Sequence, residues 1–236
     1  MMSLNGKYSL GIVITFVLLA FSIFYSIPLI NLFFQSKSIT SEIFFYNRLS
    51  LWLVLLLVLI YNFFIEDRSF FIWEDRKYSA GFYLTSVISL YLICVIGGAF
   101  LNGIIMLTTH EKISDKLLQL NLVFKNNYFL IFFTCLTAGV IEELLMRAYI
   151  QPRIEKIYNS PILGIVVSSL LFGILHSSYG TIGQVVVPFF IGIVFSVFYK
   201  KYSNIKILII CHFMIDFISL MMMNMMGIKH LSLLNL

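Results

Sequence analysis

The chain carries two carboxylates and a guanidinium in the stretch Ile141-Glu142-Glu143-Leu144-Leu145-Met146-Arg147, which follows an apolar segment, 128–140, typical of a membrane helix. Each such charge costs about 2.5 to 3.5 kcal/mol at the centre of a membrane helix, so charges kept there indicate a functional site. Helical spacing of about 100° per residue puts Arg147 on the face of Glu143 and turns Glu142 away from Arg147. We expect Glu143 and Arg147 to neutralise each other and Glu142 to be the free carboxylate. Packing between helices is the alternative reason for all three charges.

The composition of the whole chain indicates a membrane protein. Of its 236 residues, 60% are hydrophobic and only 11% are charged, and the mean hydropathy is +0.97. These values exclude an ordinary soluble domain and are typical of polytopic membrane proteins. Cys94, Cys135 and Cys211 lie singly in apolar segments, which predicts small buried side chains and neither a disulfide framework nor a thiolate metal site. The net charge of +5 is spread over short loops, so we expect no nucleic-acid partner.

Apolar runs long enough to cross a bilayer predict an all-α, polytopic transmembrane bundle of about seven helices. The first run is too long for the core of a signal peptide and no small-residue cleavage site follows it, so we expect it to remain as a membrane span. The fifth and sixth runs are short, which allows one of them to be tilted, buried or partly re-entrant. The runs are Tyr8–Phe34, Leu49–Ile65, Ala80–Leu107, Tyr128–Ile150, Ile162–Leu175, Val185–Tyr199 and Ile205–Met226.

The segments between these runs predict an orientation. Loop lysines and arginines, with Arg48 and Arg153 counted among them, are more numerous on the N-terminal side, so we predict a cytoplasmic N-terminus in a protein of the cell membrane. Residues 66–77 place charges on both sides of an aromatic patch, which is typical of a segment anchored at the headgroup level. Residues 110–126 are polar and mixed in charge, and we interpret them as a connector.

Side chains capable of chemistry are unevenly distributed over the spans. The expected spans before Tyr128 contain no acid, base or imidazole within their apolar runs, so we expect every buried charged or imidazole side chain after that position. This asymmetry predicts N-terminal membrane helices, 1–126, that pack, anchor or gate. They would be followed by a helical core that carries the chemistry, 127–226, and a short C-terminal tail, 227–236.

Two further stretches, like the first, carry acid or imidazole side chains within an apolar span. One span ends with the imidazole of His176, one turn after Phe172, whose ring is placed to hold it. Another span, the last one, begins with Cys211-His212-Phe213-Met214-Ile215-Asp216, in which His212 and Asp216 share a helix face. Either histidine alone is well explained as a hydrogen-bonded core residue. Together, acids and imidazoles confined to three short stretches on three helices predict one common site.

Around a water-accessible cavity these side chains suit hydrolysis. A poorly solvated Glu142 is suited to take a proton from water and return it to a leaving amine. His176 can share that water, His212 can hydrogen-bond the oxyanion formed at a scissile carbonyl, and Asp216 can orient His212. Zinc is the alternative, because these two acids and two imidazoles are enough ligands for an ion that would activate the water itself. The contiguous H-E-x-x-H motif is absent, so the sequence offers no independent signature of zinc.

The ordered motifs E-E-x-x-x-R, F-x-x-x-H and H-x-x-x-D resemble the CPBP family of intramembrane proteases, also called the CAAX protease and bacteriocin-processing or ABI family. Each motif is unspecific alone, and the specificity lies in their order. The resemblance extends over 137–220 and includes Arg147-Ala148-Tyr149-Ile150-Gln151-Pro152-Arg153 after the first motif, which Glu143 and Arg147 complete.

The resemblance implies an all-helical membrane peptidase whose cavity opens to the membrane and to one aqueous side. It implies that Glu142 and His176 activate the water and that His212 assists at the oxyanion. The last motif position is often Asn in relatives and is Asp216 here. Because an ionised carboxylate cannot donate a hydrogen bond to an oxyanion, Asp216 either orients His212 or binds a metal. The choice between a glutamate-type and a metal-dependent mechanism stays open.

Two functions of other classes compete with a peptidase. A non-enzymatic membrane scaffold that regulates a sensor or a transporter would have no need for the buried charges of Glu142, His176 and His212. A proton-coupled transporter would show repeated halves with broken helices, which the sequence lacks. For the peptidase, the expected partner is a membrane-embedded or lipid-modified peptide or protein within the lipid bilayer.

Overall fold

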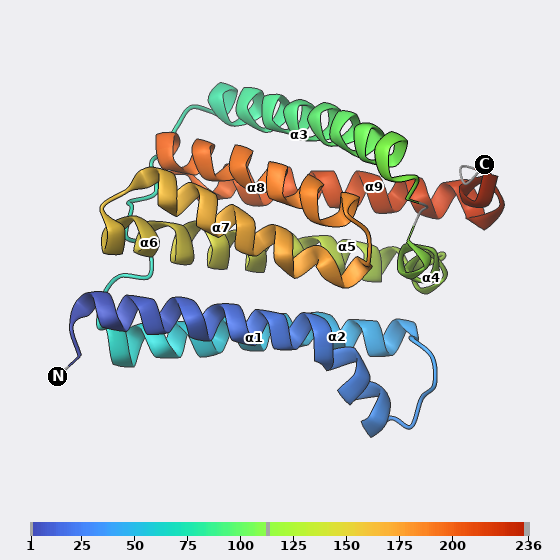
Figure 1. Ribbon diagram of the computed structural model, residues 1–236, viewed down its shortest axis with the longest axis horizontal. Coiled ribbons are helices and arrows are strands. Elements are labelled where there is room, and N and C mark those ends of the chain that lie inside the picture. The colour runs from blue at the N-terminus through green and yellow to red at the C-terminus, as the bar shows by residue number, and fades with distance from the viewer. Residues whose placement is uncertain (1, 112–113, 234–236) are drawn as a thin grey trace.

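The computed structural model describes residues 2–111 and 114–233, and every regular element in this part of the chain is a helix (Figure 1). Seven helices are long and apolar enough to cross a membrane, which confirms the predicted bundle. The two runs predicted to be short extend to Pro161–Tyr179 and Gly183–Tyr202, so neither needs to be re-entrant. The other spans are Leu4–Phe33, Ser41–Glu66, Ala80–Thr109, Tyr128–Tyr158 and Ile205–Met225.

The spans contain both regular and irregular helical segments. The α-helices are α1 (Leu4–Phe33), α2 (Ser41–Tyr61), α3 (Ala80–Thr109), α4 (Asp115–Phe124), α5 (Tyr128–Thr137), α6 (Gln151–Tyr158), α7 (Pro161–Leu175), α8 (Gly183–Tyr202) and α9 (Ile205–Leu233). Three π-helical segments interrupt them: η1 (Asn62–Glu66), η2 (Ala138–Glu142) and η3 (Leu144–Ile150). The segment η4 (His176–Tyr179) is a short 3-10 helix.

Short polar side chains begin several of these helices. Thr40, Ser79 and Ser160 each accept a hydrogen bond from the backbone N–H three residues later, in the first turns of α2, α3 and α7. Left-handed residues end others, with φ of 48° at Asn159 after α6 and 46° at Ser203 after α8. These residues satisfy backbone groups that have no partner within the helix, and they let the chain turn back into the membrane within a few residues.

The long helices lie side by side in layers (Figure 1). One layer holds α1 and α2, the next holds α5, α6 and α7, and α8 and α9 follow, with α3 packed on their outer side. The short helix α4 lies across one end of the bundle, where it packs on α2, α5 and α9. The interpretation of 110–126 as a plain connector is therefore wrong. Leu117, Leu120 and Phe124 recur at helical spacing and give α4 an apolar face.

The C-terminal helix is longer than its membrane-spanning part. It continues to Leu233 and so includes most of the predicted tail, 227–236, of which 234–236 lie outside the described residues. The predicted division between 126 and 127 falls between α4 and α5. The separate roles of the two parts stay a prediction.

A buried ion pair ties the N-terminal layer to the centre of the bundle. Arg153 Nη2 lies 2.6 Å from Glu66 Oε2, and both side chains are fully buried. The Tyr149 hydroxyl donates to the other Glu66 oxygen at 2.6 Å, and the ring of Phe70 stacks on that of Tyr149 at 5.4 Å. Buried charges are thus not confined to positions after Tyr128, and segment 66–77 packs on the core instead of only anchoring at the headgroups.

The positive charges counted for the predicted orientation do not all lie in loops. Arg48 lies within α2 and Arg153 within α6, and some of the lysines counted for the orientation, such as Lys7 and Lys200, also lie within helices. No finding tests which side of the membrane these charges face. The cytoplasmic N-terminus stays a prediction.

Candidate active site

A cavity of about 320 Å³ lies among α2, α4, α5, α7, α8 and α9. Its wall includes Glu142, His176, His212 and Asp216, so the structure brings all four predicted residues to one space. Other lining residues come from the start of α2, the end of η4 and the start of α8. The cavity therefore lies toward the membrane face opposite to the N-terminus, the right-hand end of the bundle in Figure 1.

The helix that carries the first motif is irregular at the motif itself. The π-helical segment η2 ends at Glu142, η3 begins at Leu144, and Glu143 lies between the two. Such wide turns are rare and occur frequently at functional sites. Here Glu142 lines the cavity, whereas Glu143 is fully buried behind it.

Glu143 joins the first motif to the third. Arg147 Nη1 donates to Glu143 Oε1 at 3.1 Å with both side chains fully buried, which confirms the predicted pair. The same oxygen lies 2.7 Å from His212 Nδ1. Asp216, predicted to orient His212, is 3.6 Å from Nε2 of that ring, which is too long for a hydrogen bond. Glu143 is therefore the residue that orients His212, a contact between helices that no spacing within one helix reveals.

Phe172 holds His176 in place through its backbone carbonyl and through its ring. His176 Nδ1 lies 2.8 Å from the Phe172 carbonyl oxygen, and because a carbonyl only accepts, Nδ1 is the donor. Neutral His176 therefore has its lone pair on Nε2. The Phe172 and His176 rings are 4.7 Å apart, which confirms the predicted support. The Phe172 ring also lies 4.3 Å from the guanidinium carbon of Arg147 and 6.0 Å from the His212 ring, so it packs between all three motifs.

Glu142 faces His212 without bonding to it. Glu142 Oε2 lies 3.9 Å from His212 Nε2, and that oxygen has no hydrogen-bond partner among the described residues. A separation of this size between two polar atoms suits a bridging water. The arrangement can therefore place a water molecule against a carboxylate and an imidazole.

The metal alternative stays a prediction. Within the described part of the chain, no group of three or more His, Cys, Asp or Glu residues is arranged to hold a metal ion. The Nδ1 atoms of His212 and His176 are engaged by Glu143 and by a backbone carbonyl, which are also the usual partners of histidines that bind a metal through Nε2. If zinc were bound, its ligands would come from Glu142, His176, His212 and Asp216.

The cavity wall also contains residues that the motifs did not predict, foremost Arg48 and Tyr179. The expected second span, Leu49–Ile65, began just after the charge of Arg48. In the structure α2 begins at Ser41, so Arg48 lies about two turns inside the helix. The N-cap residue Thr40 was the available signal for the earlier start.

A glycine sets the distance between α9 and the first motif. A Cβ atom at Gly139 would lie 3.0 Å from the carbonyl oxygen of Ile209 and 3.2 Å from the backbone nitrogen of Phe213. Both distances are shorter than ordinary contacts, and the atoms belong to the backbone on either side of His212. The absence of a side chain at 139 thus allows His212 to reach Glu143.

We expect Gly139→Ala to lower turnover about tenfold, because an added Cβ displaces α9 by a few tenths of an ångström and small misplacements of reacting groups are costly. The measurement is kcat of the purified variant on a peptide that the wild type cleaves. Gly103→Ala is the matched control, since a Cβ at Gly103 meets nothing within 4 Å. Equal turnover by the two variants would contradict this role of Gly139.

One protein family matches part of the chain. The sequence model of the family described as Type II CAAX prenyl endopeptidase Rce1-like matches residues 124–218. The matched part includes all three motifs. This finding confirms the resemblance to CPBP-type proteases and implies a peptidase. No curated protein and no solved structure matches the chain.

Proposed function

We propose that this chain, whose residues 124–218 match the Rce1-like CAAX prenyl endopeptidases, is an intramembrane endopeptidase that hydrolyses a membrane-embedded or lipid-modified peptide or protein. One observation carries the proposal: Glu142, His176 and His212 come from three different helices and line one cavity. A scaffold would gain nothing from this convergence, because charged and imidazole groups within a membrane are costly.

Hydrolysis begins with the water between Glu142 and the imidazoles. Glu142 Oε2 takes a proton from this water, and the lone pair on His176 Nε2 accepts its second hydrogen bond. The hydroxide then attacks the scissile carbonyl carbon and forms a tetrahedral intermediate with one negative oxygen. No nucleophilic side chain is needed for this step.

His212 stabilises the oxyanion as an imidazolium. Its Nδ1 proton is engaged by Glu143, so the ring has a donor for the oxyanion only when Nε2 is protonated as well. The carboxylates of Glu143 and Asp216, at 2.7 Å and 3.6 Å from the two ring nitrogens, stabilise that positive charge. The intermediate collapses with cleavage of the C–N bond, and Glu142 returns its proton to the leaving amine.

The class of substrate depends on which side of the membrane the cavity faces. The family points to a membrane-associated prenylated protein as the substrate. With the predicted cytoplasmic N-terminus, the cavity faces the extracytoplasmic side, where it can reach only bonds that lie on that side of the membrane. The side on which the cleaved bond lies therefore tests the predicted orientation and narrows the class of substrate.

The proposal is tested by comparing protein termini in membranes from cells that carry wild type or Glu142→Gln at equal expression. The substitution keeps the size of the side chain and removes the base. We expect specific new termini with wild type that are absent with Glu142→Gln, and the protein that carries them is the substrate. Glu74→Gln, which changes an exposed carboxylate outside the spans, is expected to keep every wild-type terminus.

Unchanged protein termini would contradict the proposal. If both membranes contain the same termini and Glu142→Gln supports the same cellular phenotype as wild type, the chain is a membrane scaffold and the peptidase function is wrong. The side of the membrane on which a lost terminus lies also fixes the orientation of the bundle.

A further inference from the structure

We propose that Trp52 is a positioning residue for the general base, because its indole N–H holds the π-helical turn that ends at Glu142. This inference rests on the proposed function, since it concerns how the water-activating carboxylate is aimed. Trp52 lies outside the three motifs and outside the matched residues 124–218. It does not line the cavity, so it would act on the reaction only through the residues that it holds.

The Glu142 oxygen that faces His212 is not held by a hydrogen bond. This oxygen, Oε2, has no hydrogen-bond partner in the part of the chain that the structure describes, and its distance of 3.9 Å to His212 Nε2 is too long for one. Glu143, by contrast, is bonded to both Arg147 and His212. The position of Glu142 Oε2 therefore depends on the backbone of η2, whose last residue is Glu142.

The π-helical turn determines the direction in which Glu142 points. A π-helical hydrogen bond joins residues five apart, whereas an α-helical hydrogen bond joins residues four apart, so a π turn accommodates one extra residue. One residue corresponds to about 100° of rotation around a helix. If η2 relaxed to an α-helix, Glu142 would rotate relative to α5 by as much as about 100° and leave the cavity wall that it now lines.

Two neighbouring helices hold the turn. On the side of α9, backbone atoms approach Gly139 so closely that a Cβ atom there would lie 3.0 Å from the nearest of them. On the side of α2, Trp52 Nε1 donates to the hydroxyl oxygen of Thr137 at 3.0 Å. Thr137 is fully buried and directly precedes η2. The indole therefore fixes the residue at which the helix begins to widen.

The bond joins the helix of the general base to another helix of the cavity wall. A hydroxyl within a helix can donate to a carbonyl oxygen of its own helix, as Thr15 does to Gly11 at 2.7 Å. The Thr137 hydroxyl accepts from α2, where Arg48, one turn before Trp52, lines the cavity. Loss of the bond would therefore free Glu142 to move relative to the opposite wall.

The first test measures kcat and KM of full-length variants on a peptide that the wild type cleaves. Trp52→Phe keeps an aromatic ring and removes the N–H donor, and Thr137→Val removes the acceptor. We expect each to lower kcat about tenfold with KM unchanged, because small misplacements of a reacting group are costly. The double variant should be no slower than the slower single variant, since both changes remove the same bond. Thr137→Ser keeps the hydroxyl and should keep the wild-type kcat.

Trp73→Phe is the matched control. The chain has two tryptophans, and Trp73 packs on the ring of Tyr199 at 5.2 Å without lining the cavity. Its kcat should equal that of wild type. Equal kcat for Trp52→Phe and Trp73→Phe, or independent losses that multiply in the double variant, would overturn the positioning role. So would a loss with Thr137→Ser as large as with Thr137→Val, and this pair decides alone if Trp52→Phe does not fold.

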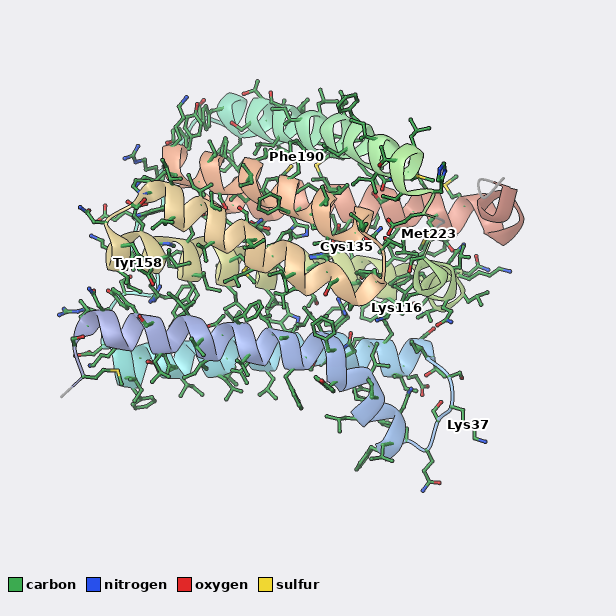
Figure 2. The ribbon with its side chains drawn as sticks, viewed as in Figure 1. Lys37, Lys116, Cys135, Tyr158, Phe190 and Met223 are labelled. Atoms are coloured by element: carbon green, nitrogen blue, oxygen red, sulfur yellow. The ribbon has the colours of Figure 1, made fainter. Side chains whose placement is uncertain are left out.

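The second test does not depend on cleavage. The three native cysteines are buried, with Cys135 inside the bundle (Figure 2), so Glu142→Cys adds a thiol to the cavity wall. The probe is a small charged methanethiosulfonate, and its reaction with the detergent-purified protein is followed by mass spectrometry. Adding Trp52→Phe should slow this labelling about tenfold, because a thiol reacts only where the reagent reaches it. Adding Trp73→Phe should leave the labelling rate unchanged.

The labelling experiment separates this inference from the proposed function. Slower labelling with Trp52→Phe, in a chain that produces no new termini in cells, would retain the role of Trp52 in aiming residue 142 and remove only the peptidase function. Labelling unchanged by Trp52→Phe, in a chain whose new termini depend on Glu142, would retain the peptidase and overturn the positioning role.

Discussion

Glu143→Leu is expected to lower kcat by about 10²- to 10⁴-fold, the range that a positioned acid or base contributes. In the proposed mechanism Glu143 does not touch the substrate. It acts through His212, whose Nδ1 proton it accepts at 2.7 Å. Without this partner the ring of His212 loses its fixed tautomer and orientation, and its imidazolium loses the nearest opposite charge. The measurement is kcat and KM on a peptide that the wild type cleaves, with a fall in kcat and little change in KM.

The same substitution also removes the partner of Arg147, so stability and catalysis must be separated. Removing one partner of a buried pair costs about 3–5 kcal/mol, whereas apolar residues of similar volume in place of both are often neutral. Glu143→Leu/Arg147→Met is therefore expected to unfold nearer to the wild-type midpoint than Glu143→Leu does. Its kcat should stay at the low level of the single variant. If turnover returned together with stability, Glu143 would be a structural residue and not a positioning residue for His212.

The sequence was sufficient for the spans and for the residues that converge. Bilayer thickness sets the length of an apolar run, so seven spans could be counted directly. Spacing within one helix predicted the contact of Glu143 with Arg147 and that of Phe172 with His176. These contacts are local, because side chains three or four residues apart on a helix are neighbours whatever the rest of the chain does.

Contacts between side chains on different helices could not be predicted from the sequence. The bond between Glu143 and His212 depends on how α9 packs on η2, and the pair of Glu66 with Arg153 depends on how α2 and η1 pack beside α6. Arg48 was missed for a different reason. A hydropathy window stops at a charge, whereas the helix continues past it because the backbone hydrogen bonds do not depend on the side chain. Charges near the end of an apolar run therefore need to be examined as possible cavity residues.

Arg153→Met is expected to lower the free energy of unfolding by about 3–5 kcal/mol, the cost of leaving one member of a buried ion pair uncompensated. Besides Glu66, the guanidinium donates to Asn62 Oδ1 at 2.6 Å and to the Tyr149 carbonyl at 3.1 Å, so one side chain joins α6 to η1, which follows α2. The measurement is denaturant-induced unfolding of the purified variant in detergent. Arg68→Met is the control, because Arg68 is exposed and its loss should change the free energy of unfolding by about 0.5 kcal/mol or less.

Removing the whole cluster should be less harmful than removing one member. In Glu66→Leu/Arg153→Met no charge is left buried, but the Tyr149 hydroxyl loses the carboxylate that accepts its hydrogen bond at 2.6 Å. An unsatisfied buried hydroxyl costs about 1–3 kcal/mol. Adding Tyr149→Phe should therefore restore most of the free energy of unfolding that the double variant still lacks. None of these residues lines the cavity, so the turnover of each folded variant should match wild type. A triple variant no more stable than Arg153→Met would mean that apolar packing around Arg153, and not its charge, joins the two layers.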